Sequence, residues 1–120
     1  MTGILVHFDT ISAIDRNAAL PHYKITSNSR LPFKKNTIYL VDSGAQYFDG
    51  TTDITRTIVI GEPSKEQKDR FTRVLKGHIA IATAEFQLNT KGSDLDYLAR
   101  RSLKRIGCDF DHGTGHGVGS

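Results

Sequence analysis

One stretch of the chain, residues 36–60, constrains the fold more than any other. Its two ends, 36–42 (NTIYLVD) and 54–60 (ITRTIVI), are rich in β-branched and aromatic side chains, which is typical of strands. Asp49-Gly50 lies between them and has the strongest local turn chemistry in the chain, because Asp-Gly favours the tight turn of a two-residue hairpin. The sequence therefore predicts a β-hairpin here.

Two helices are predicted after the hairpin. Ser64, followed three residues later by Gln67, has the pattern of a capping box, and we expect a helix from there to about Phe86. Apolar spacing predicts one helix face that packs on the sheet, made of Phe71, Val74, Leu75, His78, Ile79 and Ala82. A second helix is expected from Ser93, with Gly107 at its C-terminal stop.

The segment before the hairpin is expected to contain short strands joined by long loops. Two β-type runs, 4–8 and 10–14, are followed by loop residues around Pro21 and Pro32. Strands followed by paired helices, without regular βαβ alternation, indicate an α+β domain with a mainly antiparallel sheet and helices packed on one side. The 120 residues are expected to form one domain at most, 1–120.

Composition argues against several classes of function. Lys and Arg number 16 against 13 Asp and Glu, but they are scattered, which gives little support to nucleic-acid binding. The longest basic group, which we interpret as a solvated helix face, is Arg100, Arg101, Lys104 and Arg105. One cysteine permits no internal disulfide, and the chain contains no apolar run of membrane-spanning length, signal peptide, GxSxG elbow or Walker loop. We expect a cytoplasmic protein without nucleic-acid or membrane partners.

Two aspartates in the hairpin are candidate metal ligands. A turn at Asp49-Gly50 pairs Asp42 with Thr57 and Asp53 with Gln46, so both carboxylates share one face among apolar residues. Two such carboxylates require a compensating cation, which a divalent metal would supply. In a flat ladder the two would lie roughly 13 Å apart, at about 3.3 Å per residue.

That separation is too large for one metal centre, so a distortion is predicted. We expect strong coiling or a β-bulge near Ser43-Gly44, because bulges re-aim side chains beside active sites. The simpler alternative is that Asp42 merely ends a strand and Asp53 caps a turn.

Histidines in two further segments could contribute chemistry. His116 lies in the glycine-rich run 112–119 (HGTGHGVG), where the small neighbours allow close approach to a metal. Such runs are also common as flexible loops. His22, in the segment LPHY, is read as a loop histidine from the residues alone.

The segments SAIDRNAALPHY, YLVDSGAQYFDGTTDITRT, VLKGHIAIATAEF and HGTGHGVGS together resemble the aminopeptidase P (Xaa-Pro aminopeptidase) branch of the pita-bread metallopeptidases. The resemblance covers nearly the whole chain and implies a partial pita-bread (creatinase/aminopeptidase) fold. It implies that Asp42, Asp53 and His116 bind two divalent metal ions, most often Mn2+, with Zn2+ or Co2+ as alternatives. Asp53 would bridge both ions.

The resemblance also implies an activity and its substrate. The reaction is release of the N-terminal residue from peptides with proline in second position, a bond that general aminopeptidases handle badly. His22 corresponds to a residue that positions substrate and stabilises the tetrahedral intermediate, and His112 is a further candidate for substrate binding. The complete protein of such a family is expected to be a homodimer.

The chain departs from the family pattern in its extent. Two glutamates and a histidine that the family uses downstream are not among its residues, and we expect a partial catalytic domain, truncated at both ends and inactive in isolation. The alternatives are a non-catalytic peptidase-like binding module of the same fold and a stand-alone structural or peptide-binding domain. Joint presence of Asp42, Asp53, His116 and His22 favours the enzyme.

Overall fold

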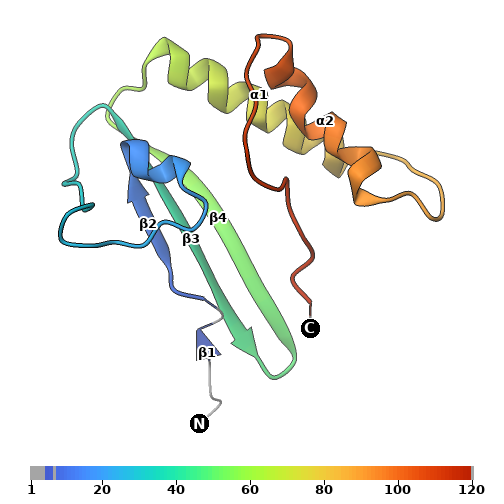
Figure 1. The fold of residues 1–120 in the computed structure, drawn as a ribbon, viewed down its shortest axis with the longest axis horizontal. Coiled ribbons are helices and arrows are strands. Elements are labelled where there is room, and N and C mark those ends of the chain that lie inside the picture. Colours follow the sequence, from blue (N-terminus) through green and yellow to red (C-terminus); the bar gives the residue numbers. More distant parts are fainter. Residues whose placement is uncertain (1–4, 7, 120) are drawn as a thin grey trace. The chain divides into compact units, whose positions relative to one another are not determined.

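The structure, a computed structural model, describes residues 5, 6 and 8–119. It divides into two compact units. The first comprises Met1–Pro63 with His116–Ser120, and the second comprises Ser64–Gly115. The first, the hairpin unit, contains the sheet, and the second, the helical unit, contains both α-helices (Figure 1).

The sheet is built around a long antiparallel hairpin. Strand β3 (Thr37–Tyr47) pairs with β4 (Gly50–Ile60) through eleven consecutive residue pairs, from Thr37 with Ile60 to Tyr47 with Gly50. Two short strands, β1 (Leu5–Val6) and β2 (Ile11–Ile14), also pair antiparallel with β3. The predicted hairpin is therefore present, and its strands are longer than the apolar runs alone indicated.

The turn lies one residue earlier than predicted. Phe48 and Asp49 form it, and neither they nor Gly50 has the positive φ that the type I′ turn of Asp-Gly requires. Asp42 therefore pairs with Thr55, and Asp53 pairs with Gly44. The predicted pairs, Asp42 with Thr57 and Asp53 with Gln46, were wrong by two residues, because turn position sets the register of the whole ladder.

The predicted bulge at Ser43-Gly44 was also wrong, since β3 and β4 pair there without interruption. The irregularity lies on the other edge of β3, where Val6 pairs with Ala45 and Ile11 with Asp42. The five residue steps from Val6 to Ile11 thus correspond to three steps along β3, from Ala45 to Asp42. Gly44 lies on β3 opposite this irregularity, where Thr52 and Phe8 approach it closely.

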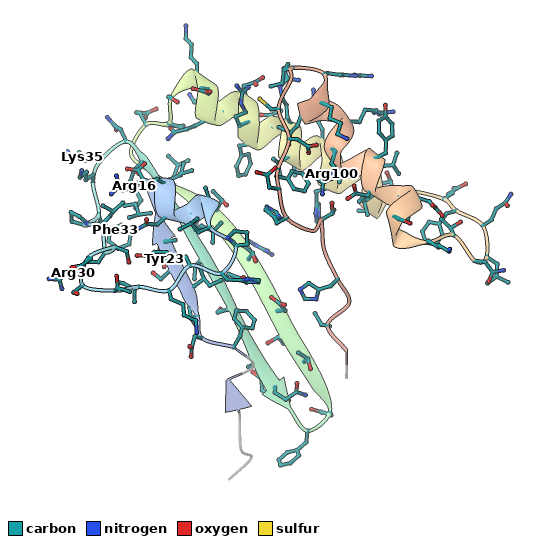
Figure 2. All side chains as sticks on the ribbon, in the orientation of Figure 1. Arg16, Tyr23, Arg30, Phe33, Lys35 and Arg100 are labelled. Carbon is teal, nitrogen blue, oxygen red and sulfur yellow. The ribbon has the colours of Figure 1, made fainter. Side chains whose placement is uncertain are left out.

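A small core supports the hairpin from the N-terminal side. Ile11, Ala13 and Tyr23 are buried together, with Leu40 of β3 packed against them. The hydroxyl of Tyr23, which Figure 2 labels, accepts a hydrogen bond from Asn17 Nδ2 (3.1 Å). Asn17 lies in the 3-10 helix Asp15–Ala19, which follows β2. A buried tyrosine with a buried amide partner ties the long loop to the sheet.

Both predicted helices are present. Helix α1 (Lys65–Ala82) begins with the predicted capping box of Ser64 and Gln67, with bonds of 3.1 and 2.8 Å. It ends four residues before the predicted Phe86, because Thr83 leaves helical geometry (φ −107°, ψ 7°). Helix α2 (Gly92–Lys104) is followed by the predicted stop at Gly107, which has a φ of +72°.

The two helices pack on each other through small residues. Gly77 is buried against the backbone of Ala99, which is itself buried. The apolar face predicted for α1 is by contrast largely exposed, with Phe71 at 52% and Val74 at 53%. Packing of that face on the sheet stays a prediction. Neither α-helix of the described residues combines the length and apolar character that crossing a membrane would demand.

Candidate metal centre

The observed register brings the two aspartates close without a bulge between β3 and β4. Asp53 lies two positions from Thr55, the partner of Asp42, so the two aspartates are diagonal neighbours on the same face of the hairpin. Diagonal neighbours are about 7–8 Å apart between Cα atoms. The metal ions of a dinuclear site lie about 3.5–4 Å apart, so carboxylates at this spacing can serve one centre.

The surroundings of Asp42 hold its carboxylate in one orientation. Thr55 Oγ1 donates a hydrogen bond of 2.8 Å to Asp42 Oδ1. Asp42 is half-buried, and it also pairs with Ile11 of β2, so it lies in the centre of the sheet. The Thr55 hydroxyl bonds one carboxylate oxygen and leaves Oδ2 open to another partner.

His116 approaches the hairpin at Asp53. Its Nε2 lies 3.5 Å from Asp53 Oδ2, and the Asp53 side chain is only 17% exposed. The other ring nitrogen, Nδ1, lies 2.8 Å from the carbonyl oxygen of Gly117. A carbonyl can only accept, so Nδ1 carries the proton, and Nε2 faces the carboxylate either as a second N–H group or with its lone pair.

This arrangement fits a metal site in its chemistry. A backbone carbonyl that holds the Nδ1 proton is the usual support of a histidine that binds metal through Nε2. A neutral Nε2 lone pair beside a carboxylate oxygen needs a cation between them. Carboxylate and imidazole donors suit Mn2+, Zn2+ and Co2+ alike. The residue types and their placement on one hairpin face therefore fit divalent ions.

Convergence of the three predicted ligands is incomplete. Asp53 and His116 come together, whereas Asp42 is bonded to Thr55. Among the residues that the structure describes, no three His, Cys, Asp or Glu side chains are close enough to hold an ion. The assignment of Asp42, Asp53 and His116 as ligands stays a prediction.

The two remaining predicted site residues lie in different units. His22 is exposed and forms part of a turn in the loop that follows the 3-10 helix. His112 belongs to the helical unit, where its ring lies against Phe110 with 4.9 Å between ring centres. Its Nδ1 lies 2.8 Å from the Gly113 carbonyl oxygen. Their roles in substrate binding stay predictions.

Arg100 makes several side-chain hydrogen bonds that were not predicted from the sequence. Arg100 was grouped with the solvated basic face of α2, yet its side chain is only 15% exposed. It donates hydrogen bonds to Asp96, Asp109 and the backbone of the segment leading to the glycine-rich run. The available signal was the Asp96 and Arg100 spacing of four residues, which allows an ion pair on a helix.

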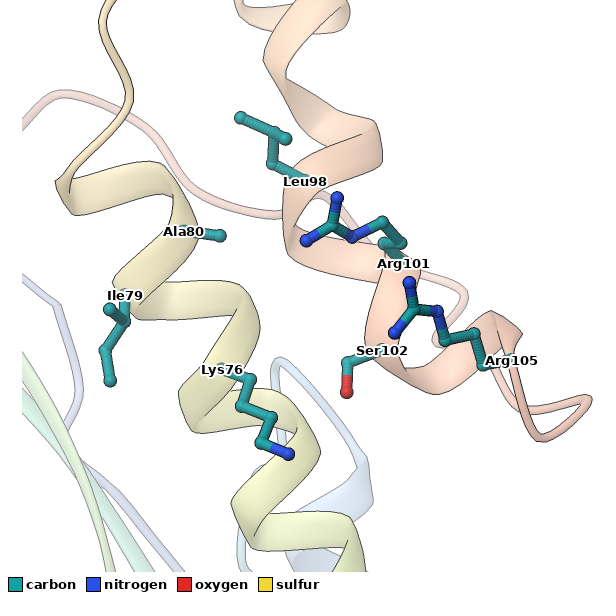
Figure 3. A pocket seen from close by; sticks show the side chains of 7 residues that line it. All are labelled: Lys76, Ile79, Ala80, Leu98, Arg101, Ser102 and Arg105. Atoms are coloured by element: carbon teal, nitrogen blue, oxygen red, sulfur yellow. The ribbon is translucent and has the colours of Figure 1, made fainter.

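Two other residues of the basic face, Arg101 and Arg105, line a groove between α1 and α2. Lys76, Arg101 and Arg105 contribute its cationic side chains, beside the apolar residues Ile79 and Leu98 (Figure 3). None of the predicted site residues lines it. The groove agrees with the interpretation of this face as solvated and contributes nothing to the candidate metal centre.

Comparison with known proteins identifies relatives of this chain. Residues 3–120 match the sequence model of metallopeptidase family M24. A probable Xaa-Pro aminopeptidase P of Laccaria bicolor is 54% identical over 112 residues, which cover 93% of this chain and 17% of that protein. Aminopeptidase P1 of Arabidopsis thaliana is 51% identical over 113 residues, which cover 94% of this chain and 18% of that protein.

Solved structures give the same result. The X-prolyl aminopeptidase from Caenorhabditis elegans, described as a cytosolic enzyme with a di-nuclear active site, matches with a TM-score of 0.89 and 51% identity. The match covers 95% of this chain and 19% of that structure. The prolidase from Pyrococcus furiosus matches with a TM-score of 0.80 and 35% identity, over 95% of this chain and 33% of that one.

These matches first define a class: the sheet and helices are part of the α+β pita-bread fold of X-prolyl aminopeptidases and prolidases. More particularly, the chain belongs to metallopeptidase family M24. It spans 17% to 18% of the length of the two curated relatives described above.

Proposed function

We propose that this chain supplies part of the active site of a dinuclear-metal aminopeptidase, which removes the N-terminal residue from peptides with proline in second position. The observation that carries the proposal is the approach of His116 to Asp53 on the hairpin face that also holds Asp42. Relatives named Xaa-Pro aminopeptidase P support the reaction and its substrate class. We regard 1–120 as a partial catalytic domain.

The residues of this chain would divide the work among them. Asp53 would bridge two divalent ions, and Asp42 and His116 would each bind one of them. Mn2+ is our first choice of metal, with Zn2+ or Co2+ as alternatives. When bound, the ions supply Lewis-acid activation of water and of the scissile carbonyl.

The two other predicted site histidines, His22 and His112, would act on the substrate. His22 would donate a hydrogen bond to the oxyanion that develops in the tetrahedral intermediate. His112 would contact the peptide substrate. The likeness to the Caenorhabditis elegans protein, a cytosolic enzyme, supports a cytoplasmic location, and we extend the proposal to a homodimeric complete protein.

Metal binding by the chain itself tests the proposed ligands. We expect saturable Mn2+ binding in titration calorimetry, and Asp53→Asn and His116→Gln should each weaken it at least about tenfold, because each removes a donor that the ion needs. Asp49→Asn is the matched control, since Asp49 is an exposed turn aspartate of the same hairpin and should leave the affinity unchanged.

Two outcomes would contradict the ligand assignment. One is a wild-type chain without saturable Mn2+ binding, which would favour the alternative of a non-catalytic binding module. The other is an Asp49→Asn variant that loses as much affinity as Asp53→Asn, which would indicate diffuse attraction of cations to the acidic hairpin.

Peptide cleavage is a separate measurement. We expect little or no hydrolysis of a peptide with proline in second position by the 120-residue chain, even with Mn2+. Three ligand side chains cannot complete the coordination of two ions. A matched peptide with alanine in second position is the control for contaminating peptidases. Proline-specific turnover at ordinary enzymatic rates would show that three ligands suffice.

A further inference from the structure

Arg100 holds most of the polypeptide that leads from α2 to the glycine-rich run. Its guanidinium donates to Asp109 Oδ1 at 3.0 Å, to the Phe110 carbonyl at 2.6 Å and to the His112 carbonyl at 2.9 Å. The same group lies 3.9 Å above the centre of the Phe110 ring. Figure 2 shows Arg100 on α2, next to this segment.

Asp96 completes the arrangement at the far end of the segment. Its Oδ2 accepts the Arg100 Nε–H at 2.8 Å, and its Oδ1 accepts a short hydrogen bond from the Thr114 hydroxyl. The segment from Asp109 to Thr114 is therefore held at both ends by two side chains one turn apart on α2. All of these residues belong to the helical unit.

The segment needs such support because it has no regular structure of its own. Residues 108–115 include no helix or strand, and a side chain at Gly113 or Gly115 would meet nothing within 4 Å. Ordering a free backbone costs conformational entropy at every residue. The planar guanidinium presents five N–H donors in a rigid fork, whereas a lysine ammonium carries its three donors on one nitrogen at the end of a flexible stem.

We propose that Arg100 is a positioning residue, which orders residues 109–114 and thereby restrains the adjoining His116, a proposed metal ligand. The inference rests on the proposed function for its consequence at the metal, and on geometry alone for the ordering of the segment. Asp96 and Thr114 act with Arg100 as the second attachment.

The electrostatics of the cluster agree with this role. The Thr114 hydroxyl and then the Arg100 guanidinium lower the pKa of Asp96 below its usual value. The Phe110 backbone N–H and then Arg100 lower the pKa of Asp109. Both carboxylates therefore remain ionised partners of Arg100 near neutral pH.

Backbone dynamics test the ordering directly. In Arg100→Lys, we expect the heteronuclear NOE values of the Gly113, Gly115 and Gly117 amides to fall toward those of a disordered chain. Arg101→Lys is the matched control, because Arg101 is exposed on the same helix. In this variant the same three glycine amides should keep wild-type NOE values. Unchanged order in Arg100→Lys would overturn the proposal.

Mn2+ affinity tests the consequence for the metal site, because a purely structural role of Arg100 would leave this affinity unchanged. We expect Arg100→Lys to bind Mn2+ about tenfold more weakly or worse, within the range for loss of an outer-shell partner. Thr114→Val should also weaken Mn2+ binding, and Thr114 lies outside α2, so this variant leaves the residues of the helix unchanged. This second variant decides the question if Arg100→Lys loses the circular dichroism of α2.

The outcomes separate the two proposals. Disordered glycines with unchanged Mn2+ affinity would overturn the positioning role while the proposed function stands. A wild-type chain that binds no Mn2+ would refute the proposed function. In that case the glycine NOE comparison still supports or overturns the ordering by Arg100.

Discussion

Gly44 shows how much a single residue decides in this hairpin. A Cβ atom there would meet the Thr52 carbonyl oxygen and lie 2.8 Å from Phe8 Cε1. The φ of Gly44 is not positive, so close approach of its neighbours, rather than backbone conformation, requires glycine. Because Gly44 is the ladder partner of Asp53, this close packing also fixes where the candidate ligand lies.

We therefore expect Gly44→Ala to lower the free energy of unfolding of the hairpin unit by about 1–3 kcal/mol, the usual cost of overpacking. Urea unfolding followed by tyrosine fluorescence would measure it. Gly50→Ala is the control, since a Cβ there meets nothing within 4 Å and φ is not positive. Similar losses in both variants would mean that glycine flexibility, and not close packing, matters at Gly44.

At the scale of elements, the contact between α1 and α2 depends on Gly77. A Cβ at this position would meet the Ala99 carbonyl oxygen and lie 2.9 Å from the Ala99 carbonyl carbon. Both contacts are backbone atoms of α2, which cannot move aside as a flexible side chain can. The two helix axes would have to separate, and the packing around Ala99 and Leu103 would loosen.

We expect Gly77→Ala to destabilise the helical unit by about 1–3 kcal/mol from overpacking, which exceeds a gain of at most about 1 kcal/mol in helix propensity. Thermal unfolding followed by far-ultraviolet circular dichroism would measure the difference. Gly92→Ala, at the first residue of α2 with nothing within 4 Å, should be neutral or slightly stabilising. Stabilisation by Gly77→Ala would contradict the close packing.

At the scale of the whole molecule, the chain has two small cores. The hairpin unit buries Ile11, Ala13 and Tyr23, and the helical unit buries Ala99 and Leu103. No side chain of the described residues is both large and fully buried. Small cores of this kind give little stability to a domain of this length.

We expect the two units to unfold in separate transitions. Three of the four tyrosines (Tyr23, Tyr39 and Tyr47) belong to the hairpin unit, whereas the helical unit contains both α-helices. Urea unfolding curves from tyrosine fluorescence and from circular dichroism should therefore have different midpoints. Coincident curves would mean that the two units unfold cooperatively as one.

Features that depend on neighbouring residues could be predicted before the fold was known. Strand composition predicted the hairpin, Ser64 and Gln67 predicted the capping box, and Gly107 predicted the end of α2. The sequence also selected Asp42, Asp53 and His116 as candidate ligands, because carboxylates in apolar surroundings require a compensating cation and an imidazole among glycines can approach a metal closely.

Tertiary structure alone decided where these residues meet. The turn at Phe48 and Asp49 shifted the ladder by two residues and brought Asp53 opposite Gly44. The approach of His116 to Asp53 joins positions far apart in sequence, and the bonds of Arg100 to residues 109–112 join a helix to the irregular segment that follows it. Local propensities contain no information on such contacts, because their free energy comes from packing and hydrogen bonding between segments that only the folded chain brings together.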